Sequence, residues 1–148
     1  MPHFGLMDES KMSEEDAALM RAKLHIRGGR RRMRQEKYAA GIAALYDAFG
    51  SGMKWYLLTH QNDDRISVTD TDVLNYENQM FDIISKAGVF REPSDFKNIF
   101  EVVDEALSGN PVKEDCVSAQ YKMENLLTEL GVLPFDEDSL PPEDPSTY

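Results

Sequence analysis

The sequence predicts an all-α protein, a four- or five-helix bundle whose first two helices run up and down as an antiparallel pair. Apolar residues recur at steps of three and four in successive segments, and residues that favour helix starts and stops stand between these segments. No stretch alternates apolar and polar residues for long enough to predict a strand. A length of 148 residues is typical of one domain with a single hydrophobic core.

The first helix is expected to begin at Ser13. Ser13 and Asp16 have the spacing of a capping box, and acidic residues in a first turn suit the positive end of the helix dipole. Gly29 lies on the apolar stripe and would allow a neighbouring helix to cross closely, whereas a break at Gly28 is the alternative. The stripe consists of Leu19, Ala22, Ile26, Gly29 and Met33.

A second helix is expected over residues 36–60, because the same spacing resumes almost at once. Only a residue or two around Gln35 separates the two patterns, which is too short for a domain linker. We therefore prefer an antiparallel hairpin to one long bent helix. The second stripe consists of Tyr38, Ile42, Leu45, Phe49, Gly52 and Tyr56.

Three further helices follow, each with a start or stop signal. The third is expected from Asp70 or Thr71 to Gly88, the fourth from Pro93 to Gly109, and the fifth over residues 113–130, before Gly131. The apolar stripe of the fourth is Phe96, Ile99, Phe100, Val103 and Leu107, and that of the fifth is Val117, Tyr121, Leu126, Leu127 and Leu130.

The bundle, residues 13–132, is expected to lie between two less ordered ends. Residues 1–12 show no sustained period and are predicted to form a flexible arm. Residues 133–148 carry four prolines, five acidic residues and little apolar matter, a composition typical of a disordered acidic tail.

Charge is distributed unevenly along the chain. The net charge is −11, yet residues 21–37 carry +7, so the rest of the chain carries −18. In a continuous helix five basic residues share one face, where like charges at spacings of three and four repel one another. This candidate partner- or phosphate-binding strip consists of Lys23, Arg27, Arg30, Arg31 and Arg34.

Three interpretations of this strip remain open. Acidic residues of the third to fifth helices, or of the acidic tail, neutralise it within the same molecule, or it binds an acidic protein partner or a second copy in a homodimer, or it binds RNA. The −18 elsewhere would repel a duplex, so short single-stranded RNA fits better than double-stranded nucleic acid. The excess of arginine over lysine favours bidentate contacts to carboxylate or phosphate.

The sequence offers no catalytic, cofactor-binding or metal-binding set. Its single cysteine, Cys116, excludes an internal disulfide and a Cys-based zinc site. His3, His25 and His60 are not expected to meet, and no phosphate-binding glycine loop is present. The chain has neither an apolar run that could span a membrane nor a signal-peptide pattern, so we expect a cytoplasmic protein without a membrane partner.

The run from Gly29 to Phe49, with Glu36-Lys37-Tyr38 at its turn and Leu45-Tyr46-Asp47-Ala48 near its end, resembles the opening hairpin of HEPN domains. These are small helical bundles of toxin–antitoxin and phage-defence systems. Catalytic members share an Arg-x(4–6)-His motif for RNA cleavage, which this chain lacks because no histidine follows His60. The resemblance therefore implies a non-catalytic, dimeric, partner-binding member.

The leading hypothesis is a non-enzymatic interaction module that binds an acidic partner or itself through the basic strip. An RNA- or nucleotide-binding or nucleotide-processing protein of a HEPN-like system is the alternative.

Overall fold

The computed structural model describes residues 6–66, 68 and 71–147, and every regular element among them is helical. The prediction of an all-α bundle is confirmed. Its helices are α1 (Glu14–Arg34), α2 (Tyr38–Thr59), α3 (Glu77–Lys86), α4 (Asp95–Leu107) and α5 (Lys113–Glu129). Short 3-10 turns add η1 (Glu9–Lys11), η2 (Thr71–Asn75), η3 (Glu137–Ser139) and η4 (Pro145–Thr147). None of the described helices is long and apolar enough to cross a membrane.

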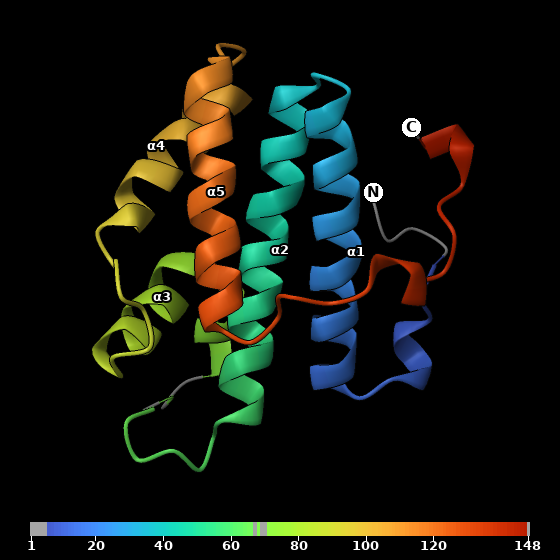
Figure 1. Ribbon diagram of the computed structural model, residues 1–148. Coiled ribbons are helices and arrows are strands. Elements are labelled where there is room, and N and C mark those ends of the chain that lie inside the picture. The colour runs from blue at the N-terminus through green and yellow to red at the C-terminus, as the bar shows by residue number, and fades with distance from the viewer. Residues whose placement is uncertain (1–5, 67, 69–70, 148) are drawn as a thin grey trace.

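α2 is the central helix, and it packs against α1, α3, α4 and α5 (Figure 1). α1 and α2 form the predicted antiparallel hairpin, with α5 on the other side of α2 and α4 beyond α5. Aromatic rings join α2, α3 and α4, because Phe81 stacks on Phe96 at 4.3 Å and both rings lie about 6.3 Å from Phe49. One continuous core therefore holds all five helices.

α1 continues through Gly28 and Gly29 without a break, because its close packing against α2 stabilises the helix at these two glycines. A Cβ on Gly29 would lie 2.8 Å from Leu45 Cγ, and one on Gly41 would lie 2.8 Å from Met33 Sδ. Such distances leave no room for a side chain at either position. The start of α1 is also as expected, because Ser13 Oγ accepts a hydrogen bond from the Asp16 amide at 3.1 Å.

The third helix starts later than expected. The proposed cap Asp70 lies outside the described residues, and Thr71 begins the 3-10 turn η2. Tyr76, with φ −127° and ψ 112°, is extended and separates η2 from α3. At the helix ends, Gly88, Gly109 and Gly131 have positive φ of 78°, 90° and 88°, as their predicted stop positions require.

The predicted stripes of α4 and α5 are partly wrong. Phe100 and Leu107 are 53% and 66% exposed, and Val117 and Tyr121 are 49% and 69% exposed. The buried faces are instead rotated about the helix axes relative to these stripes, although Ile99 and Val103 in α4 and Leu126 and Leu127 in α5 are buried as predicted. These faces consist of Ile99, Val102, Val103 and Ala106 in α4, and Cys116, Ala119, Met123, Leu126 and Leu127 in α5.

Candidate functional site

α1 carries three arginines that bind carboxylates of the same molecule, and we call Arg27, Arg30 and Arg31 the arginine face. The helical spacing of three and four places them on one side of α1, as predicted. Arg27 and Arg31 are only 9% and 7% exposed, which is unusual for arginine. A buried guanidinium needs a partner, because leaving it without one costs several kcal/mol.

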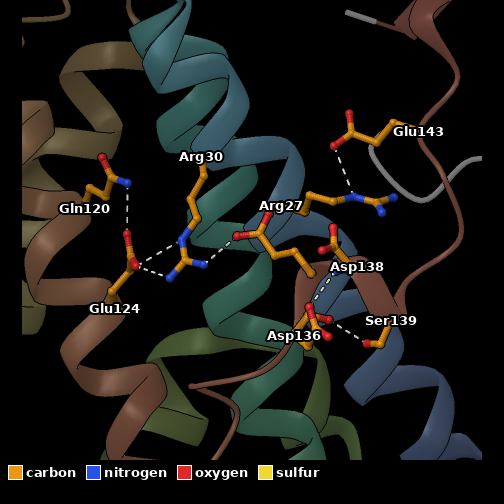
Figure 2. A network of polar contacts seen from close by, with 9 residues as sticks. Arg27, Arg30, Gln120, Glu124, Asp136, Asp138, Ser139 and Glu143 are labelled. Carbon is orange, nitrogen blue, oxygen red and sulfur yellow. Dashed lines mark hydrogen bonds and ion pairs between the residues drawn. The ribbon is translucent and has the colours of Figure 1, made fainter.

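Glu143, in the C-terminal tail, supplies that partner for two of the three arginines. Its Oε1 lies 3.1 Å from Nε of Arg27, and its Oε2 accepts a hydrogen bond from Nε of Arg31 at 2.5 Å. The Glu143 side chain is itself only 12% exposed. One shielded carboxylate therefore bridges two nearly buried guanidinium groups; Figure 2 shows its contact with Arg27.

Arg30 lies between two further carboxylates (Figure 2). It donates to Glu124 of α5 through Nε at 3.1 Å and through Nη2, and to Glu137 of η3 through Nη1 at 2.9 Å. Gln120 holds Glu124 in place with a hydrogen bond of 2.9 Å. Burial alone would lower the pKa of Arg30, but its hydrogen bonds and charge interactions with Glu124 and Glu137 raise it.

The tail reaches the arginine face by crossing α2 and α1 on one side of the bundle (Figure 1). On its way, the ring of Phe135 lies 5.6 Å below the ammonium group of Lys23, within cation–π range. Leu140 is 7% exposed, although it is not part of the main core cluster. The structure places this segment along α1, with Leu133 and Leu140 buried, Phe135 packed against the core, and Glu137 and Glu143 paired with arginines.

The predicted strip is thus divided by the fold. Arg27, Arg30 and Arg31 pair with carboxylates of the tail, Lys23 lies over the ring of Phe135, and Arg34 is exposed at the end of α1. Arg32, which was not among the candidates, has a lowered pKa through partial burial and the neighbouring charge of Arg31.

Neutralisation by acids of the same chain, expected from the later helices or the acidic tail, is what the structure shows, with Glu124 of α5 and Glu137 and Glu143 of the tail as the partners. The sequence did not single out Glu137, Leu140 and Glu143 individually. A usable signal existed, because these residues repeat at a spacing of three within a proline-containing segment. The N-terminal arm makes a similar contact on a smaller scale, since Arg21 pairs with Glu9 of η1.

Among the other described residues, no second set of polar side chains has contacts as shielded as those of the arginine face. Within the described part of the chain, no group of three His, Cys, Asp or Glu side chains could hold a metal ion. Burial raises the pKa of the Cys116 thiol, which keeps it protonated at neutral pH and fits a structural role. A cavity of about 710 Å³ is lined by Lys54, Leu57 and Ile66 among others and shares no lining residue with the arginine face.

Comparison of the chain with protein-family models, curated proteins and solved structures found no match. The resemblance to HEPN domains therefore stays a prediction.

Proposed function

We propose that this protein is a helical interaction module whose arginine face binds carboxylates of an acidic protein partner. The observation that carries the proposal is the bridge from Glu143 to Arg27 and Arg31. Arg31 donates a charge-assisted hydrogen bond to this shielded carboxylate, and Arg27 forms an ion pair with it. Charge-assisted hydrogen bonds are among the stronger polar contacts in proteins. A surface that holds one acidic segment in this way has the chemistry to hold another.

The surroundings of the arginine face favour carboxylates over nucleic acid. Glu124 already lies beside Arg30, and residues outside 21–37 carry a net −18. Nucleic-acid affinity depends on neutralising many phosphates, which a narrow basic strip in an acidic molecule does poorly. An acidic protein segment therefore fits the arginine face better than RNA does.

The proposal can be tested by affinity capture from the source lysate at low salt. One bait is the full chain with Leu140→Ser and Glu143→Gln, which weakens the hold of the tail. A second bait adds Arg30→Gln and Arg31→Gln, and a matched control adds Arg34→Gln instead. Proteins and nucleic acids are both identified, and cross-linking maps the contacting segment of any captured protein.

The proposal requires a protein that the first and control baits capture, that the Arg30/Arg31 bait loses, and that is cross-linked through an acidic segment. Capture of RNA with the same dependence on Arg30 and Arg31 would replace the proposal with the RNA alternative. Light scattering of the purified first bait detects self-association. Equal capture by all three baits would show that the arginine face binds nothing outside its own chain.

A further inference from the structure

The segment on the arginine face has a regular three-residue repeat. Glu137 lies in the 3-10 turn η3, and Leu140 follows with φ −83° and ψ 156°, which are polyproline-II values. Pro141 and Pro142 keep the chain extended up to Glu143. Both conformations have three residues per turn, so Glu137, Leu140 and Glu143 point to the same side, towards α1.

This repeat matches what each side chain does. Glu137 pairs with Arg30, Leu140 is buried, and Glu143 joins Arg27 and Arg31. The arginine face therefore accommodates an acidic residue, an apolar residue and a second acidic residue at positions i, i+3 and i+6. Attraction between charges alone would not place a buried leucine midway between the two carboxylates, so the register is part of the contact.

The segment is also attached in a way that allows it to leave as a unit. Its backbone hydrogen bonds join residues within the tail, from Ser139 to Asp136 and from Leu140 to Glu137. The hold on α1 comes from side chains, and Leu140 lies outside the main core cluster. Release would open no part of that cluster, whereas it would remove the Glu143 carboxylate from two nearly buried guanidinium groups.

We propose that the arginine face is a docking groove for an acidic, proline-containing segment of a partner protein that forms a 3-10 turn followed by an extended, polyproline-II stretch. The recognised pattern is acid-x-x-apolar-x-x-acid. Residues 136–144 are its intramolecular occupant, and a partner segment with the same spacing displaces them. This inference rests on the proposed function and adds the conformation and register of the ligand.

A different protein is a better competitor than a second copy of this chain. A tethered segment has an effective concentration of about millimolar, so a second identical tail gains nothing over the first. A partner must add contacts, and a groove of about 570 Å³ next to Arg30 offers them. Val117 and Tyr121 line this groove and are 49% and 69% exposed.

The test uses a fluorescent peptide that copies residues 134–147 and is titrated with full-length protein by anisotropy. One protein is the wild type, and the other is the Leu140→Ser/Glu143→Gln variant, whose own tail is weakened. A control peptide of identical composition exchanges Ser139 and Leu140, which moves the leucine out of register by one position. Circular dichroism confirms that the variant is folded, and the single Glu143→Gln variant replaces it if it is not.

The copied peptide should bind the weakened-tail variant about tenfold more tightly than the wild type, because no intact tail competes for the face. The exchanged peptide should bind that variant about tenfold more weakly than the copied peptide, because its leucine misses the buried position. Equal binding of both peptides would overturn the inference and leave the proposed function standing. Binding of neither peptide to a folded variant would overturn both.

Discussion

Gly29 of α1 lies against Gly41 of α2, and this contact sets how closely the two helices approach. A Cβ at Gly29 would come within 3.2 Å of the Gly41 carbonyl oxygen and 2.8 Å of Leu45 Cγ. Gly29→Ala should therefore destabilise the protein by about 1–3 kcal/mol, since overpacking outweighs the gain in helix propensity. Urea unfolding followed by circular dichroism measures this difference.

Gly50→Ala is the matched control in the same hairpin. Its added Cβ would meet Glu77 Cγ at 3.2 Å, and that side chain is flexible enough to move. Unfolding free energy should stay level or rise by up to about 1 kcal/mol, the propensity difference between glycine and alanine. A Gly29→Ala variant as stable as Gly50→Ala would show that the crossing is looser than the structure indicates.

The helices could be predicted because periodicity and end signals are local properties. The Ser13 cap and the stop at Gly131 depend on nearby residues, and both stand where expected. Which face of a helix is buried is harder to predict when apolar residues occur on more than one of its faces. In α5 Cys116 is buried and Tyr121 is 69% exposed, and which of the two faces is buried depends on the neighbouring helices, which no local pattern reveals.

The arginines of the candidate site could be found in the sequence, and so could the acidic tail and the later helices as sources of neutralising acids, but not which carboxylates pair with which arginine. Glu143 follows Arg31 by 112 residues, and only the path of the chain after α5 brings them together. Composition predicts a disordered tail, since few apolar residues stand among its acids and prolines. Leu140 is nevertheless enough to hold the segment against α1, because the carboxylates on each side of it pair with arginines that are shielded from water.

Loss of the shared carboxylate should destabilise the folded chain. Glu143→Gln leaves Arg27 and Arg31 without their anion, and we expect a cost of about 1–3 kcal/mol, lower than for a fully buried pair because the tail can release and admit water. Urea unfolding at neutral pH measures it. Asp138→Asn removes the same charge from an exposed tail position and should change stability by at most about 0.5 kcal/mol. Equal effects of the two substitutions would mean that only the net charge matters.

Asp47 should make the protein less stable as pH rises. Partial burial, followed by the charge of Glu77, raises the pKa of Asp47. The folded state then binds this proton more tightly than the unfolded state, whose Asp pKa is about 3.9. The resulting stability is present below that value and is lost as pH rises through the folded pKa. Asp47→Asn should therefore be more stable than the wild type at pH 7, with the difference shrinking towards pH 3.5.

Urea unfolding at both pH values checks the Asp47 prediction. Asp104→Asn makes the same charge change at an exposed position of α4 and separates the local effect from that of the net charge of −11. A gain in Asp47→Asn that matches Asp104→Asn, or that persists at pH 3.5, would contradict it.

Leu140 should decide whether the tail is ordered. Its side chain is 7% exposed and lies outside the main core cluster, so Leu140→Ser should free the tail while leaving the five helices intact. Heteronuclear NOE values for residues 136–144 should be near those of the helices in the wild type and fall in the variant. The amides of α2 should keep their chemical shifts, and Ser139→Ala, at an exposed neighbouring position, should leave the tail ordered. Low NOE values in the wild-type tail would show that the carboxylates bind the arginine face only transiently.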